Sequence, residues 1–227
     1  MTIKLEQKIT GYEVVSKNEP VAVEEKEENN IIQMHEKVAR PEMLFGSTYK
    51  IKTPQSDYAL YVTINDMILN KDTAHEIRRP FEVFINSKNM DHYQWIVALT
   101  LIISAVFRKG GDVTFLVEEL RSVFDPSGGY FKRGGKFMPS LVAEIGDVIC
   151  DHMVMIGMIK EQKLDENVQN ILDAKREEFE RNMGLKDSRH TSEFPVGAQL
   201  CKKCHTKAAI MMDGCLTCLN CGESKCG

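Results

Sequence analysis

The sequence has no long hydrophobic run, no surplus of one charge and a single tryptophan. Of its 227 residues 43% are hydrophobic, and 29 Lys and Arg nearly balance 33 Asp and Glu, giving a formal net charge of −4. The longest apolar segment, 95–107, is interrupted by Thr100 and Ser104 and is too short to cross a bilayer. We therefore expect a core helix there and no membrane segment. Near neutrality also means that nucleic-acid binding would require a local basic patch.

The N-terminal residues lack the pattern of a signal peptide, because MTIKLEQKIT contains no apolar run after a basic start. We expect a cytoplasmic protein. In a reducing cytoplasm, closely spaced cysteines act as metal ligands or redox thiols rather than as a disulfide framework. Six of the seven cysteines fall in residues 201–227, so this segment is the most informative part of the chain.

Apolar periodicity predicts the secondary structure of the middle of the chain. Alternation of apolar and polar residues predicts strands over 58–65 and 81–85, which we expect to pair antiparallel. Helical spacing predicts helices over 89–108, 112–124, 139–159 and 164–182. The glycine-rich stretch 127–136 is expected to form a hairpin or a partner contact rather than a phosphate site on Lys132, Arg133 and Lys136.

The fold class expected from these elements is α+β, with a small antiparallel sheet packed on a helical layer and a C-terminal zinc-ribbon-like tail. Five regions are expected. Residues 1–40 carry an acidic run with little to bury, and they should form a disordered or loosely docked arm. The α+β domain should cover 41–160, a charged amphipathic helix 161–185, a polar linker 186–200 and the cysteine-rich tail 201–227.

The tail has the cysteine spacing of a zinc ribbon. Two Cys-x-x-Cys turns, Cys201–Cys204 and Cys215–Cys218, are separated by ten residues. Two thiolates on one tight turn can bind one metal ion, and a second such turn completes a tetrahedron. A short tail also needs a metal to fold, since it cannot bury enough apolar surface alone. The sequence predicts zinc, with unliganded thiols and an iron–sulfur site as alternatives.

Six cysteines exceed the four that one zinc ion needs, so two partitions are open. In the partition that we favour, the ligands are Cys201, Cys204, Cys215 and Cys218. In the other, Cys218 and Cys221 form the second turn and leave Cys215 and Cys226 free. His205, next to Cys204, is a further candidate ligand.

The favoured partition leaves Cys221 and Cys226 as a thiol pair at the outer end of the sequence, where Gly222 and Gly227 allow movement. A mobile thiol pair suits thiol–disulfide exchange, because the attacking thiolate must reach its target disulfide directly. Lys225 beside Cys226 would lower the pKa of that thiol.

Two stretches of the sequence carry a resemblance to a known family. One is the tail, DGCLTCLNCGESKCG, and the other is RRPFEVFINSKNMDHYQWIVALTLIISAVFRKGGDVTFLVEELRSVFDPSGGYFKRGGKFMPSLVAEIGDVI. They resemble the C-terminal portion of adenosylcobalamin-dependent (class II) ribonucleotide reductases. The resemblance runs from about Arg40 to Ile159 and resumes at Cys201. Some bacteria split this reductase into two genes, and the chain is similar to the smaller, C-terminal subunit.

The resemblance implies an oxidoreductase subunit in deoxyribonucleotide biosynthesis, and hence in DNA synthesis, that is not catalytically complete alone. The large catalytic subunit of this ribonucleoside-diphosphate reductase would bind adenosylcobalamin. In this family a C-terminal cysteine pair re-reduces the active-site disulfide, and Cys221 and Cys226 match that pair in spacing and place. A thiol reductant such as a thioredoxin-like protein would then reduce the pair again.

Two other functions compete with this interpretation. In the first, zinc only braces an interaction module that assembles a partner. In the second, the ribbon binds nucleic acid, but residues 198–227 contain four Lys, one Asp and one Glu, and no aromatic ring on which a base can stack. We therefore expect no direct contact with nucleic acid, and none with a membrane.

Overall fold

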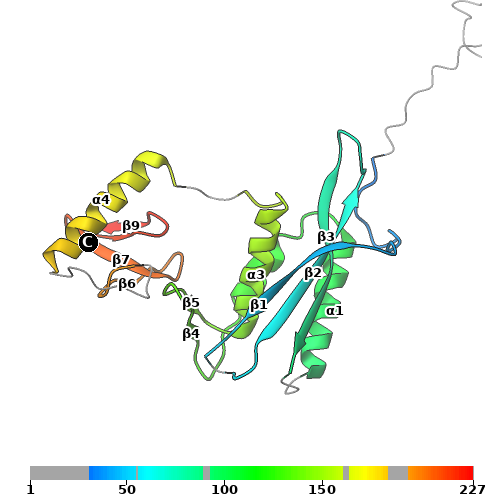
Figure 1. Ribbon diagram of the computed structural model, residues 1–227, viewed down its shortest axis with the longest axis horizontal. Coiled ribbons are helices and arrows are strands. Elements are labelled where there is room, and N and C mark those ends of the chain that lie inside the picture. Colours follow the sequence, from blue (N-terminus) through cyan, green and yellow to red (C-terminus); the bar gives the residue numbers. More distant parts are fainter. Residues whose placement is uncertain (1–30, 55, 89–92, 161–163, 184–193, 227) are drawn as a thin grey trace, which may run out of the picture. The chain divides into compact units, whose positions relative to one another are not determined.

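The computed structural model describes residues 31–54, 56–88, 93–160, 164–183 and 194–226 (Figure 1). The chain divides into two units, 1–31 and 32–227, and all helices and strands of the described part belong to the second. Most of the arm expected over 1–40 thus lies outside the described residues. Within its last part, Met34 is buried in a small cluster with Met67, Leu69 and Phe81.

Three antiparallel strands form the main sheet, in the order β1 (Phe45–Ile51), β2 (Leu60–Leu69) and β3 (Ile77–Ser87). The pairing of β2 with β3 confirms the predicted hairpin. Strand β1 was not predicted, because in FGSTYKI only the final isoleucine is fully buried and Ser47 interrupts the alternation of Phe45, Tyr49 and Ile51. Its place depends on pairing with β2, from Phe45 opposite Asp66 to Ile51 opposite Leu60.

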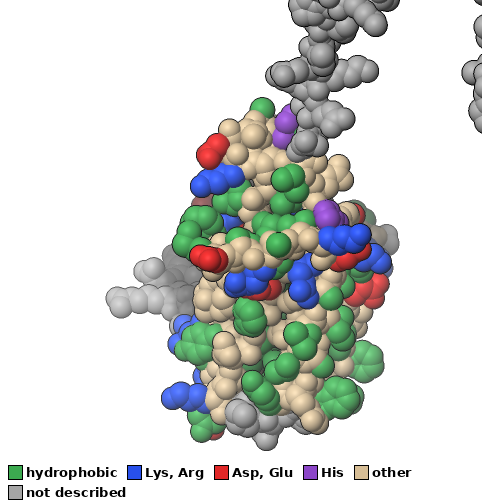
Figure 2. Space-filling model, turned by 90° about the vertical axis from the view of Figure 1, so that its right-hand side faces the viewer, with side chains coloured by type: hydrophobic (Ala, Val, Ile, Leu, Met, Phe, Trp, Pro, Cys, Tyr) green, Lys and Arg blue, Asp and Glu red, His purple; other side chains and the backbone are tan. Residues whose placement is uncertain are grey.

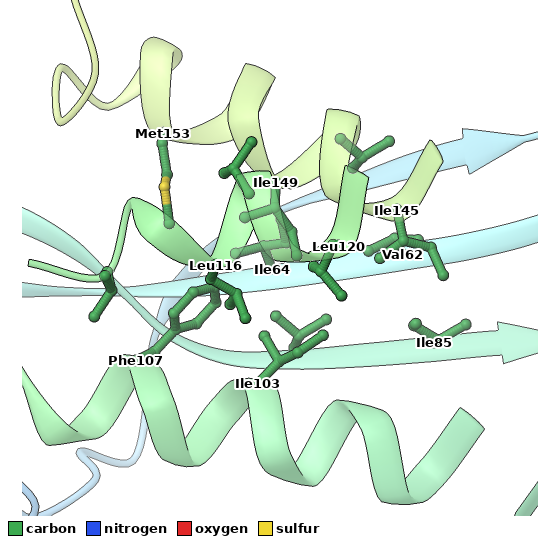
Figure 3. Packing of buried hydrophobic residues seen from close by; sticks show 14 of the residues in the cluster. Val62, Ile64, Ile85, Ile103, Phe107, Leu116, Leu120, Ile145, Ile149 and Met153 are labelled. Atoms are coloured by element: carbon green, nitrogen blue, oxygen red, sulfur yellow. The ribbon is translucent and has the colours of Figure 1, made fainter. Parts of the chain in front are cut away.

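Helices α1 (Tyr93–Lys109), α2 (Phe115–Arg121) and α3 (Leu141–Met155) pack with one face of this sheet in a single core, and α1 also runs along the open edge of β3. In Figure 3 the side chains of these helices meet those of β2 and β3 in one core, with the labelled residues Ile103, Phe107, Leu116, Leu120, Ile145, Ile149, Met153, Val62, Ile64 and Ile85. The expected α+β architecture is confirmed. The described residues contain no helix long and apolar enough to cross a membrane.

The predicted helices are present, with shifted ends. Of the helix expected over 89–108, residues 89–92 lie outside the described part, and α2 is shorter than expected. Asp112 does not cap α2 directly; it accepts hydrogen bonds from the Thr114 amide and hydroxyl at 2.9 and 2.7 Å. Ser140 caps α3 and Asp165 caps α4 (Glu166–Asn182), each accepting a main-chain N–H.

The glycine-rich stretch forms a hairpin of β4 (Tyr130–Phe131) and β5 (Phe137–Met138). Two of its three cations are paired within the chain, Lys132 with Glu144 at 3.1 Å and Lys136 with Asp147. Burial opposes ionisation of Asp147, yet Lys136 and Arg121 hold the pKa of that carboxyl below its usual value. The hairpin is therefore fastened to α3 by ion pairs.

A buried polar network joins the sheet to α3. His152 Nε2 lies 2.8 Å from Asp66 Oδ1, and His152 Nδ1 lies 2.8 Å from the hydroxyl of Tyr49. The other carboxylate oxygen of Asp66 accepts from Arg78 at 2.8 Å. His152 and Asp66 are almost fully buried, so every polar atom here needs its partner.

We expect Asp66→Ala to lower the free energy of unfolding by roughly 3 kcal/mol, because it leaves both His152 and Arg78 without their acceptor. Urea unfolding of the purified chain measures this. The exposed Asp57→Ala is the matched control and should change stability by less than about 0.5 kcal/mol. Equal effects of the two substitutions would contradict the structural role of the network.

Candidate metal centre and cysteine pair

Four short antiparallel strands form the cysteine-rich ribbon, in the order β6 (Gln199–Leu200), β7 (Lys207–Met212), β8 (Cys215–Cys218) and β9 (Ser224–Cys226). Strand β6 uses two residues that were expected to end the linker. Ala208, Ala209 and Ile210 of β7 are buried, which gives the ribbon a small apolar interior. So small an interior stabilises little by itself.

Two cysteine turns in the ribbon have the same local geometry. After Cys201-x-x-Cys204, His205 adopts a left-handed conformation (φ 53°), and its N–H donates to the Cys201 carbonyl at 3.0 Å. After Cys218-x-x-Cys221, Gly222 is also left-handed (φ 70°) and donates to the Cys218 carbonyl at 2.9 Å. Each turn therefore folds back on itself and directs two thiols to the same side.

The two turns bring four thiols together: Cys201, Cys204, Cys218 and Cys221. Their sulfur atoms all lie within 4.8 Å of one another. Across the turns, Cys201 Sγ is 3.8 Å from Cys221 Sγ, and Cys204 Sγ is 3.6 Å from Cys218 Sγ. A zinc ion with Zn–S bonds of about 2.3 Å has tetrahedral S···S edges of about 3.8 Å. The group can thus hold a metal ion, and it fits zinc.

Neighbouring polar groups favour the thiolate form of one of the four thiols, Cys204. Burial alone would raise the pKa of Cys204, but hydrogen bonds from Asn220 and Thr206 lower it to about 6. Burial raises the pKa of Cys218, which is 1% exposed. A bound cation would offset that cost, since metal ions bind the deprotonated thiol.

The structure groups the thiols of the second partition, and not those of the partition that the sequence favoured. Cys215 and Cys218 lie three positions apart in strand β8, so their side chains point to opposite faces. Only Cys218 faces the other turn. Cys221, expected to be a free thiol, takes the fourth position, and His205 is outside the group.

The remaining two cysteines form a disulfide, Cys215–Cys226. They are directly opposite each other in the register of β8 and β9, with Cα atoms 4.1 Å apart. The expected pairing of Cys221 with Cys226 is therefore replaced by that of Cys215 with Cys226. Cys226 is exposed and Cys215 is half-buried, so solvent reaches this bond from the β9 side.

One feature of the sequence favours the observed partition. A Cys-x-x-Cys turn closes on a left-handed residue, which glycine adopts without strain. Gly222 follows Cys221, whereas Leu219 follows Cys218. Closing the turn after Cys218 would therefore force a leucine into an unfavourable conformation. In the first turn the left-handed residue is His205 rather than glycine, so the sequence does not show this rule there. Histidine tolerates a positive φ better than most residues do.

Residues 33–153 match the TSCPD domain, which covers more than half of the chain. The chain belongs to this domain family. The TSCPD domain is found in adenosylcobalamin-dependent ribonucleotide reductases, which agrees with the resemblance in the sequence. No curated protein and no solved structure matches the chain.

Zinc binding distinguishes the two partitions through one pair of variants. We expect Cys221→Ser to weaken zinc binding by more than roughly 100-fold, because it removes a ligand, and Cys215→Ser to leave it unchanged. Zinc content after chelator competition, measured by mass spectrometry of the metal, reports both. The opposite pattern would restore Cys215 as a ligand.

Proposed function

We propose that this chain is an accessory subunit of an adenosylcobalamin-dependent ribonucleotide reductase and that Cys215 and Cys226 carry electrons to the catalytic subunit. The observation that carries the proposal is a pair of cysteines outside the four-thiol group, on a chain that also contains a TSCPD domain. Adenosylcobalamin and the ribonucleotide would bind to the catalytic subunit. We expect the complex in the cytoplasm, where dithiol reductants are available.

The proposed step is two successive thiol–disulfide exchanges. In the reduced ribbon, one thiolate of the pair attacks the disulfide that each turnover leaves in the catalytic subunit, and a mixed disulfide forms as one target sulfur departs. The second thiolate of the pair then attacks the ribbon sulfur of the mixed disulfide. This attack releases the other target sulfur as a thiol. Two electrons and two protons pass to the target, and the Cys215–Cys226 bond is formed. An external dithiol protein of the thioredoxin class reduces this bond again.

The division of the cysteines supports this role. A thiolate bound to zinc has its lone pair engaged, so the four grouped thiols would hold the ribbon in shape. Cys226 lies exposed on β9, and its bond to Cys215 can be reached by an attacking thiolate.

Turnover with two different reductants tests the proposal. In the assembled enzyme, we expect Cys215→Ser/Cys226→Ser to reduce sustained turnover with a thioredoxin-like protein by at least about 100-fold. Dithiothreitol is small enough to reduce the active-site disulfide directly, so activity with it should remain. The matched control is Cys150→Ser, which changes a free cysteine on α3, outside the ribbon.

Three measurements would contradict the proposal. Undiminished turnover of the double variant with the protein reductant would show that the pair carries no electrons. In that case the ribbon only braces an interaction surface. Loss of zinc from the double variant would place these cysteines in the metal centre instead. Failure of the chain to co-purify with a cobalamin-dependent catalytic subunit would refute the subunit assignment.

A further inference from the structure

Helix α1 has an outer face without charge. Between Tyr93 and Phe107 the helix carries no Asp, Glu, Lys or Arg, and its only charged residues are Arg108 and Lys109 in the last turn. A helix on the surface of a globular protein normally has charged or polar residues on its solvent side, whereas a helix that is apolar all round is normally buried. The outer face of α1 therefore has the composition of a buried helix surface rather than of a solvent-exposed one.

The inner face of α1 is already occupied. Ile103 and Phe107 are fully buried in the main core, and the Ser104 hydroxyl accepts a hydrogen bond from the Val83 N–H of β3 at 3.0 Å. The helix thereby covers the open edge of the sheet. Its orientation is set by these contacts, so the opposite face points outward.

Three large apolar side chains lie on that outward face. Trp95 is 69% exposed, Leu101 62% and Ile102 61%. Figure 2 views the molecule from the side on which α1 lies in Figure 1. Hydrophobic side chains gather in the lower half of the Figure 2 view. Together the three leave roughly 400 Å² of apolar surface per chain, near the largest patch of a typical monomer. We call Trp95, Ala98, Leu101, Ile102 and Ala105 the α1 outer face.

On the α1 outer face, Trp95 and Ile102 each have an alanine at the same distance on the other side of residue 100. Trp95 and Ile102 are seven residues apart, about two helical turns, and thus lie on the same stripe. Ala98 and Ala105 lie between and beyond them on nearly the same stripe. When two such helices run antiparallel with their midpoints near residue 100, Trp95 and Ile102 each meet an alanine, and Leu101 meets Leu99. Trp95 of one copy then opposes Ala105 of the other, and Ile102 opposes Ala98.

We propose that the α1 outer face is a homodimer interface, in which two copies of α1 pack antiparallel across a twofold axis. A twofold interface must be complementary to itself, which this arrangement of large and small residues satisfies. No charged side chain of the face is desolvated or brought next to a like charge. The two faces and their surrounding atoms would bury about 1,000 Å² in total, the lower limit of a specific interface. The inference does not depend on the proposed function.

The sequence supplies a direct probe, because Trp95 is the only tryptophan. Over about 1 to 100 μM full-length chain, we expect sedimentation velocity to show a monomer–dimer equilibrium. Tryptophan emission should shift to shorter wavelength over the same range as Trp95 leaves water. Ile102→Glu should weaken the dimer by at least roughly 100-fold, since it buries a charge at the interface.

A second variant distinguishes a defined register of the two α1 helices from nonspecific apolar association. Ala105→Phe adds apolar surface but places a ring against Trp95 of the other copy, so we expect it to weaken the dimer about tenfold or more. A nonspecific apolar patch would associate more strongly with this variant. Phe84→Glu is the matched control: Phe84 is 48% exposed on β3, off the α1 outer face, and its substitution should leave the dimer unchanged.

Several results would overturn the proposal. They are a monomer throughout the concentration range, a dimer that survives Ile102→Glu, or stronger association of Ala105→Phe. A monomer whose emission shifts only when a cobalamin-dependent catalytic subunit is added would assign the face to that subunit. A monomer whose emission moves to longer wavelength on deletion of residues 1–30 would assign it to the chain's own first residues.

Discussion

The separation of the metal centre from the disulfide depends on the alternation of side chains along strand β8. Cys215 and Cys218 are three positions apart, and a strand directs such residues to opposite faces. Cys218 thus belongs to the second cysteine turn, while Cys215 lies opposite Cys226 of the neighbouring strand β9. A helix at the same place would have put both cysteines on one face. The strand conformation therefore determines which thiols can bind metal and which can exchange.

The first cysteine turn also connects the ribbon to the α+β domain. His205 closes this turn through its N–H, and its carbonyl accepts from the Phe137 N–H of β5 at 2.6 Å. The Lys207 N–H donates to the Gly135 carbonyl at 2.8 Å. Because the same short segment shapes the turn and pairs with the hairpin, the geometry of the metal centre and the attachment of the ribbon are coupled. The ion pair of Lys136 with Asp147 carries this coupling to α3.

Sequence reasoning predicted the parts of the fold whose residues bury a periodic face. The β2–β3 hairpin and the four helices have such a pattern, and the glycine pairs of 127–136 indicated the β4–β5 hairpin. In strand β1 the signal is incomplete, since Ser47 interrupts the apolar positions, and the place of the strand follows from its pairing with β2. Strands β6, β8 and β9 are only two to four residues long, which is too short for periodicity to be visible.

At the site, the sequence predicted a four-cysteine metal centre and a separate pair but assigned Cys215 and Cys221 to the wrong groups. Spacing counts residues without regard to conformation, and Cys-x-x-Cys occurs at both 215–218 and 218–221. Backbone strain resolves the ambiguity, because only the second motif is followed by a glycine that can close the turn. The metal ligands follow from where the chain can turn tightly. The exchangeable pair then consists of the two cysteines that lie in strands and face each other across a ladder.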